Sequence, residues 1–332
     1  MRYRTYHPLF ILLFLIGCLG PRQSTTTSAV STDQVKSEIQ SKKASLVSDS
    51  DVNLGYRRIN QPDPVDLMDV AIFQLDNGLT VYLTENHEEP RFYAEVAVRV
   101  GAKNDPEDAT GLAHYLEHLL FKGTQELGTT DYKREKPHLD RITQLYEQHF
   151  EETTPEKRKE IYVQINTESQ LAAQYAVPNE LDKLYASMGA SFKNAGTGQE
   201  LTVYQINLPA NRLQQWAKIE SHRLFGKPVF RLFHTELETV YDEKNRSLDN
   251  KDRLIRDAVY ELVYKKHPYK RSILGTVEHL KKPSLVKIYD FFDTYYVPNN
   301  MAICISGDIE IEKTIQIIAE NFKHLEPEVL PT

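Results

Sequence analysis

Two histidines and a glutamate in the run HYLEH, residues 114–118, are the side chains of this sequence best suited to chemistry. Residues four apart lie on the same face of a helix, so His114 and His118 present two imidazoles to one point. Glu117 follows His114 by three residues and shares that side. Two imidazoles and a carboxylate, with a fourth position for water, are typical ligands of catalytic zinc. The run therefore predicts a hydrolytic site for one Zn²⁺ ion per chain.

Glu117 is expected to act as the general base and not as a ligand. Zinc lowers the pKa of a bound water molecule to about 7. A carboxylate beside the metal then takes the proton and later delivers it to the leaving amine. The alternative is a surface helix with incidental histidines. Leu116, Leu119 and Leu120 argue against it, because they supply a face that must be buried.

A third protein ligand is expected from the acidic helix predicted over residues 235–248. Glu236 and Glu243 lie seven residues, or two turns, apart and share one stripe of this helix. Their separation along the helix axis is about 10 Å, so both cannot easily bind one metal ion. One is then a ligand, and the other is an outer group that orients a histidine or the site. The helical spacing leaves the choice between them open.

The elements that must position these residues alternate between strands and helices. An Asp-Asn-Gly turn at 76–78 between two apolar runs predicts a hairpin, and residue alternation predicts further strands. The predicted strands are 71–75, 79–83, 92–100, 191–194, 200–208 and 301–306. Apolar residues at helical spacing predict helices at 111–121, 133–177 (as two), 213–217, 235–248, 253–264, 285–295 and 311–322. This mixture, with hairpins early, favours an α+β fold in two layers.

The N-terminus has the pattern of a targeting segment. Two arginines precede an apolar run at residues 9–17, which is too short to span a bilayer and is typical of a secretory signal. The sequence LIGC, residues 15–18, resembles a bacterial lipobox, which predicts cleavage before Cys18 and acylation of its thiol. A plain secretory signal is the alternative. Leu19, where Asp would favour inner-membrane retention, points to an outer-membrane anchor that faces the periplasm of a bacterial cell envelope.

Composition suggests the remaining organisation of the 332 residues. We expect a signal peptide at 1–18, a flexible Ser-, Thr- and Lys-rich tether at 19–64, a globular domain at 65–326 and the start of a linker at 327–332. A formal net charge of −7 and the lack of a basic run argue against nucleic acid as a partner. Cys18 and Cys304 are too few for a disulfide framework or a zinc finger.

Five segments in chain order resemble the pitrilysin/insulinase family of inverted-zincin (HxxEH) metallopeptidases. They are HYLEHLLFKGT, KNAGTGQELTVYQINLP, ELETVYDE, HPYKRSILG and YYVPNNMAICISGD, and the resemblance covers residues 68–327. The matching part is the N-terminal catalytic domain, which is related to mitochondrial processing peptidase. The resemblance implies a zinc metalloendopeptidase with a mostly antiparallel sheet covered by helices, the fold of the mitochondrial processing peptidase.

The resemblance also implies roles for single residues. The zinc glutamate of the family ends a V-x-x-E segment and matches Glu243, whereas Glu236 matches a position that supports the site without binding metal. The strand to which substrates of the family pair matches Asn194, Ala195 and Thr197. Peptides or unfolded segments are therefore expected to bind as an added β-strand.

One departure from the family lies between the second histidine and the zinc glutamate. His118 and Glu243 are 125 residues apart, more than is usual, and a helical insertion at about 130–180 accounts for the extra length. Family members form a chamber from paired domains, so we expect a second peptidase-fold domain, a partner subunit or a homodimer to complete the activity. The alternatives are a non-catalytic subunit of a paired peptidase and a periplasmic peptide-binding lipoprotein.

Overall fold

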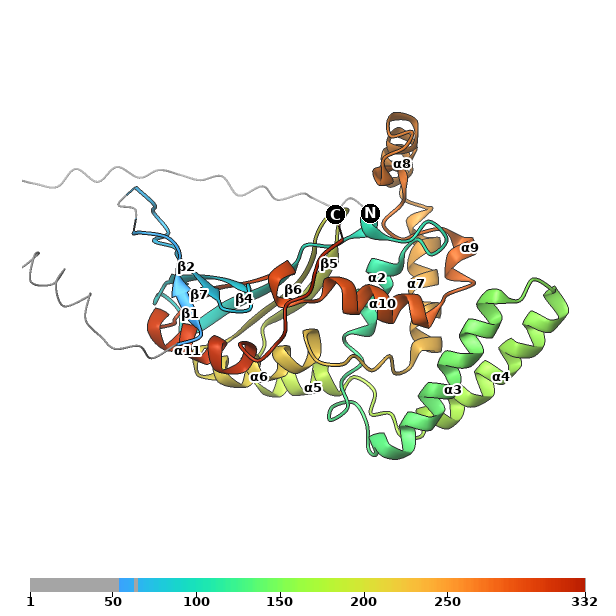
Figure 1. The fold of residues 1–332 in the computed structure, drawn as a ribbon, viewed down its shortest axis with the longest axis horizontal. Helices are drawn as coiled ribbons and strands as arrows, with labels where there is room; N and C mark the ends of the chain where they lie inside the picture. Colours follow the sequence, from blue (N-terminus) through green and yellow to red (C-terminus); the bar gives the residue numbers. More distant parts are fainter. Residues whose placement is uncertain (1–53, 63–64, 332) are drawn as a thin grey trace, which may run out of the picture. The chain divides into compact units, whose positions relative to one another are not determined.

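The computed structural model describes residues 54–62 and 65–331 (Figure 1). The predicted signal peptide, the predicted lipidation site Cys18 and most of the tether predicted at 19–64 lie outside these residues. No helix in the described part of the chain has both the length and the apolar character needed to cross a membrane.

Within the described residues, seven strands form one sheet in the order β1-β2-β3-β7-β4-β6-β5. The strands are β1 (Tyr56–Arg58), β2 (Ala71–Leu75), β3 (Thr80–Glu85), β4 (Arg91–Val98), β5 (Phe192–Thr197), β6 (Thr202–Pro209) and β7 (Met301–Gly307). β3 and β7 run parallel, and every other neighbouring pair is antiparallel. The sheet is thus mostly antiparallel, as the family resemblance implies, and β5 forms one of its edges.

The predicted hairpin joins β2 and β3. Gly78 adopts a φ of +89°, the left-handed region that a glycine enters without strain. Asn77 donates hydrogen bonds to the carbonyl oxygens of Phe322 and Leu325, so the turn also holds the end of the last helix. β1 lies inside the segment predicted as a tether. Its one aromatic side chain, Tyr56, packs edge-on against Phe73 of β2 with 5.9 Å between ring centroids.

Helices cover one face of the sheet and leave the other half-exposed. Every second residue of β4, from Phe92 to Val98, is buried, and the residues between them are partly exposed. Trp216 packs edge-on against Phe92 from the helical side. The helices of this layer include α2 (Leu112–Leu119), α6 (Leu213–Leu224), α10 (Leu285–Tyr295) and α11 (Ile311–Phe322) (Figure 1). The α+β class in two layers is confirmed.

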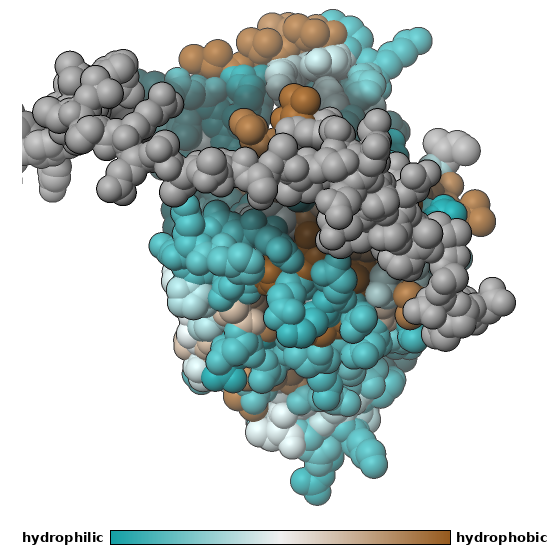
Figure 2. All heavy atoms as spheres, turned by 90° about the vertical axis from the view of Figure 1, so that its left-hand side faces the viewer, coloured by the Kyte–Doolittle hydropathy of each residue, from teal (hydrophilic) through white to brown (hydrophobic). Residues whose placement is uncertain are grey.

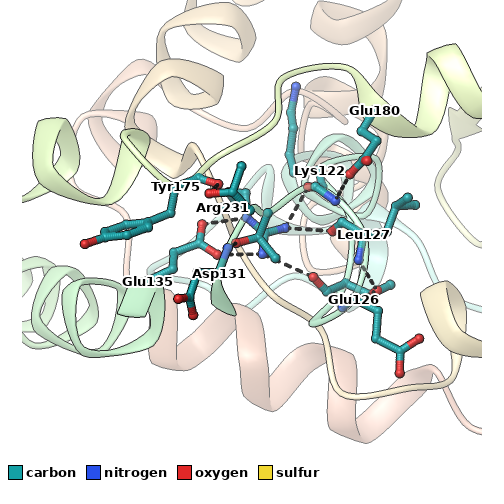
Figure 3. A network of polar contacts seen from close by, with 12 residues as sticks. Lys122, Glu126, Leu127, Asp131, Glu135, Tyr175, Glu180 and Arg231 are labelled. Atoms are coloured by element: carbon teal, nitrogen blue, oxygen red, sulfur yellow. Dashed lines mark hydrogen bonds and ion pairs between the residues drawn. The ribbon is translucent and has the colours of Figure 1, made fainter. Parts of the chain in front are cut away.

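A helical hairpin occupies the insertion predicted at 130–180. α3 (Tyr132–Glu151) and α4 (Pro155–Ala173) lie side by side (Figure 1), and α5 (Glu180–Ser187) follows them. The guanidinium of Arg231, 1% exposed, ties α3 to the loop after α2 (Figure 3). It donates to both carboxylate oxygens of Glu135, at 2.6 and 2.8 Å, and to the carbonyl oxygens of Lys122, Thr124 and Leu127.

The remaining helices are α7 (Phe233–Ser247), α8 (Lys251–Val263) and α9 (Val277–Leu280). The helices predicted near α7 and α8 and at α6, α10 and α11 are confirmed, each starting within a few residues of its expected place, whereas α9 was not predicted. α8 has no buried residue, and it exposes the apolar side chains of Leu254, Ile255, Val259, Leu262 and Val263. In Figure 2 the visible surface is largely hydrophilic, and hydrophobic residues gather along its upper margin, at the height of α8 in Figure 1.

Candidate metal centre

The helix that carries the HYLEH run is held at its N-terminus by a buried carboxylate. Asp105 accepts hydrogen bonds from the backbone N–H groups of Gly111, at 2.7 Å, and Ala113, at 2.9 Å. These are among the N–H groups that a helix leaves without partners at its start. Burial raises the pKa of Asp105 to about 7, while the two backbone hydrogen bonds act in the opposite direction. Asp105 was not predicted as part of the site, because its separation from the helix matches no local capping pattern.

Three side chains of the predicted set meet at one point. His114 and His118 of α2 and Glu243 of α7 each place a ligand atom within 4.8 Å of the other two. Oε2 of Glu243 lies 3.5 Å from Nε2 of His114 and 3.5 Å from Nε2 of His118. Two imidazole nitrogens and one carboxylate oxygen are the donors that a catalytic zinc ion takes from a protein, and this arrangement therefore fits zinc.

The pKa values of the two histidines shift in opposite directions. Burial lowers the pKa of His114 to about 4, so its imidazole is neutral at pH 7 and has a lone pair for a metal. Burial also acts to lower the pKa of His118, but hydrogen bonds to Glu236 and Glu243 outweigh it and raise this pKa to about 9. The hydrogen bond to His118 is in turn the largest cause of the lowered pKa of Glu243.

Glu236 lies behind His118, on the side of the ring away from Glu243. Its Oε1 is 2.9 Å from Nδ1 of His118, and its Oε2 is 2.5 Å from Nζ of Lys122. Although burial acts to raise the pKa of Glu236, these two contacts lower it. Such a partner fixes the orientation of a metal-binding imidazole and leaves Nε2 for the metal. Nδ1 of His114, in contrast, is buried with no hydrogen-bond partner among the described residues.

Lys122 was not predicted as part of the site. It follows His118 by four residues, a spacing that would have placed it on the same side of a continued helix.

Glu117 faces the edge strand and not the three ligand atoms. Its Oε2 accepts a hydrogen bond of 2.7 Å from the hydroxyl of Thr197 in β5. Burial raises the pKa of Glu117, and this hydrogen bond acts to lower it. Ala195 and Thr197 pair with the buried residues Tyr204 and Thr202 of β6, so they share the helix-covered face of the sheet. Asn194, one residue away, belongs to the opposite face.

A cavity of about 550 Å³ lies against this cluster. The predicted residues His114, Glu117, His118, Asn194, Ala195, Thr197, Glu236 and Glu243 all contribute to its lining. The structure thus brings every predicted site residue within its described part to one cavity. Asp182, Lys193 and Arg253 also line it and were not predicted. Lys193 directly precedes the predicted Asn194 on β5, whereas Asp182 and Arg253 come from helices that carry no predicted site residue.

Comparison with known proteins gives two family matches in chain order. Residues 80–139 match the model described as Insulinase (Peptidase family M16), and residues 284–331 match the model described as Peptidase M16 inactive domain. The first match contains the HYLEH run.

Curated relatives align with about three quarters of the chain. An uncharacterized zinc protease of Rickettsia felis is 24% identical over 258 residues, which are 76% of this chain and 50% of the relative. The probable mitochondrial-processing peptidase subunit beta of Schizosaccharomyces pombe is 25% identical over 259 residues, 76% of this chain and 45% of the relative. The chain therefore spans half or less of the length of these relatives.

Two solved structures share the fold. A protease from Helicobacter pylori superposes with a TM-score of 0.59 at 22% identity, over 80% of this chain and 53% of that one. Pitrilysin superposes with a TM-score of 0.60 at 18% identity, over 83% of this chain and 25% of that one. Two family models matched in chain order, zinc protease relatives and a pitrilysin-like fold thus all relate this chain to the insulinase family, peptidase family M16.

Proposed function

We propose that this chain is a zinc metalloendopeptidase, with His114, His118 and Glu243 as the ligands of one Zn²⁺ ion and Glu117 as the general base. The observation that carries the proposal is the convergence of three ligand atoms within 4.8 Å beside a buried glutamate and an edge strand. The zinc protease relatives support the same class of reaction. The alternatives are a non-catalytic subunit of a paired peptidase and a periplasmic peptide-binding lipoprotein.

The zinc ion, Glu117 and strand β5 have separate roles in the proposed reaction. Zinc supplies a Lewis acid that polarises the peptide carbonyl and lowers the pKa of water. Thr197 holds Oε2 of Glu117, and no described residue donates a hydrogen bond to Oε1, so this oxygen can hold the transferred proton. Peptides bind as an added strand along β5, with Asn194, Ala195 and Thr197 supplying the pairing edge next to that carboxylate.

The test combines zinc content with hydrolysis of a mixed peptide library. The purified protein should contain one zinc ion, lose hydrolysis on chelation and regain it when zinc is returned. A chain that binds zinc but hydrolyses no peptide, alone or with a partner, would instead support the non-catalytic subunit. A chain that binds peptides without zinc would support the peptide-binding lipoprotein.

A second peptidase-fold domain, subunit or identical copy is proposed as the partner that completes the activity. One relative of this chain is named as a subunit of a processing peptidase, and the relatives are about twice as long as the matched segment or longer. Exclusion of water from a peptidase site and exact positioning of the substrate normally require that a cleft closes.

Replacement of Glu243 by Gln should weaken zinc binding more than replacement of Glu236 by Gln. Glu243 contributes a charged oxygen to the ligand cluster, whereas Glu236 contacts only the rear nitrogen of His118. Loss of such a supporting group typically costs about 10–100-fold in affinity. Competition with a chromogenic chelator measures both constants, and thermal unfolding shows whether each variant is folded. The reverse order of affinities would make Glu236 the ligand.

We also propose that Cys18 is acylated and anchors the protein to the bacterial outer membrane, facing the periplasm. The support is the LIGC sequence after a short apolar run. Cys18→Ser should move the protein from the membrane fraction to the soluble fraction, because acyl chains would be its anchor. Mass spectrometry of an unmodified Cys18 in the wild-type protein would contradict this proposal.

A further inference from the structure

Three cationic side chains line the cavity beside the metal centre, and they differ in whether a carboxylate neutralises their charge. Nζ of Lys122 lies 2.5 Å from Oε2 of Glu236, and Lys193 forms an ion pair with Asp182. Both carboxylates belong to the same lining, so these two charges are compensated locally. Arg253 is different, because its guanidinium makes no ion pair and no hydrogen bond within the described residues.

The place of Arg253 in the fold is well defined. It lies in the first turn of α8, where the side chain of Asn250 accepts a hydrogen bond of 3.0 Å from its backbone N–H and caps the helix. The residue is half-buried, and it faces the same cavity as the metal-ligand candidates His114 and Glu243. A ligand that reaches the metal centre therefore passes within reach of an unpaired guanidinium.

The balance of charge around the cavity favours an acidic ligand at this position. The two paired lysines add no net charge. Zinc with two neutral imidazoles and the carboxylate of Glu243 carries a charge of about +1, which ionised Glu117 offsets. Arg253 then remains as the uncompensated charge. A guanidinium offers five N–H donors in a planar fork that matches the two oxygens of a carboxylate.

We propose that Arg253 is a specificity-determining residue that binds a carboxylate of the substrate. The peptidase then prefers peptides with Asp or Glu close to the cleaved bond over peptides with Lys or Arg there. This inference rests on the proposed function and adds the substrate class to it. A C-terminal carboxylate offers the same chemistry as an acidic side chain, and the experiment separates the two sources.

Arg256 provides a matched control on the same helix. It follows Arg253 by three residues, its side chain is 53% exposed, and it does not line the cavity. Nε of Arg256 lies 3.9 Å from Oδ1 of Asp257, a loose ion pair. Charge reversal at Arg256 changes the net charge of the protein by the same amount as charge reversal at Arg253, but it leaves the cavity unaltered.

The experiment measures kcat/KM of the zinc-loaded protein for peptides blocked at both ends, with one Glu, Gln or Lys placed at each position in turn. At the position that contacts Arg253, we expect a preference of about tenfold for Glu over Gln, because hydrogen bonds between charged groups are stronger than those to a neutral amide. Arg253→Gln should remove this preference, and Arg253→Glu should reverse it toward Lys. Arg256→Glu should keep the wild-type order. Zinc content and thermal unfolding verify that the variants are folded.

A second measurement uses binding in place of turnover. The Glu117→Gln protein, loaded with zinc, should bind the Glu peptide about tenfold more tightly than the Gln peptide, and added Arg253→Glu should reverse the order. Peptides with a free C-terminus and no acidic side chain show whether the terminal carboxylate is the group bound. Unchanged selectivity in Arg253→Glu would overturn the inference even if hydrolysis is normal. Absent hydrolysis with an Arg253-dependent binding preference would overturn the proposed reaction and leave the inference standing.

Discussion

Replacing Glu117 by Gln is expected to leave zinc bound and to lower kcat for peptide hydrolysis by about 10²–10⁴-fold, the usual contribution of a general base. Glu117 is not among the three residues whose ligand atoms converge, so the metal affinity should change little. The amide has the same shape as the carboxylate, and its oxygen can still accept the hydrogen bond from Thr197. It cannot hold the transferred proton, and that loss alone should slow the reaction.

Atomic absorption and steady-state kinetics on the same preparation measure both quantities. Thr197→Val is the matched control, because it removes the hydrogen bond to Glu117 but keeps the carboxylate. Its loss of activity should be smaller than that of Glu117→Gln. Turnover close to that of the wild type in zinc-loaded Glu117→Gln would rule out Glu117 as the base.

Replacing Arg231 by Met should lower the free energy of unfolding by about 3–5 kcal/mol, the cost of breaking a buried ion pair by removing one partner. Glu135 is fully buried, with 0% exposure, and its carboxylate would lose both hydrogen bonds from the guanidinium. The carbonyl oxygens of Lys122, Thr124 and Leu127 would lose their donor as well (Figure 3). Methionine replaces the length of the side chain but none of these bonds.

Urea unfolding of the full-length protein measures the effect. Lys136→Met is the control on α3, the helix of Glu135, since Lys136 forms an exposed pair of 2.6 Å with Asp140. An exposed ion pair of this kind contributes little to stability, because solvent screens it. The double variant Arg231→Met with Glu135→Leu should recover part of the stability, because no buried charge is then left unpaired. Equal stability of Arg231→Met and Lys136→Met would show that the buried pair contributes no more than the exposed one.

The buried pair of Arg231 and Glu135 is also connected to the metal centre through polar contacts. Arg231 holds the main chain of residues 122–127, the segment that directly follows the metal helix. The side chain of Lys122 in this segment contacts Glu236, which in turn contacts His118. The helical hairpin that begins with α3 is therefore connected to the candidate ligands through one continuous set of polar contacts.

The sequence alone was enough for features that depend on neighbours within a few residues. The HYLEH spacing placed His114 and His118 on one helical face, and the structure has α2 there. The turn at Asn77-Gly78 and the alternation along β4 likewise predicted a hairpin and a half-buried strand. These predictions succeed because a helix repeats every 3.6 residues and a strand every two. The spacing of apolar and polar residues within a short segment therefore reveals the element.

Helical spacing left the choice between the two glutamates open, and only the family resemblance pointed to Glu243; the tertiary structure places Glu243 against the ligand atoms of the histidines and Glu236 behind His118. Helical periodicity puts Glu236 and Glu243 on the same stripe and cannot say where α2 crosses it. The strand order likewise depends on β7, which comes from the far end of the domain and inserts between β3 and β4. Asp105 and Arg253 join the site from elements separated from it in sequence. Their positions follow from long-range packing, which no short segment of the chain specifies.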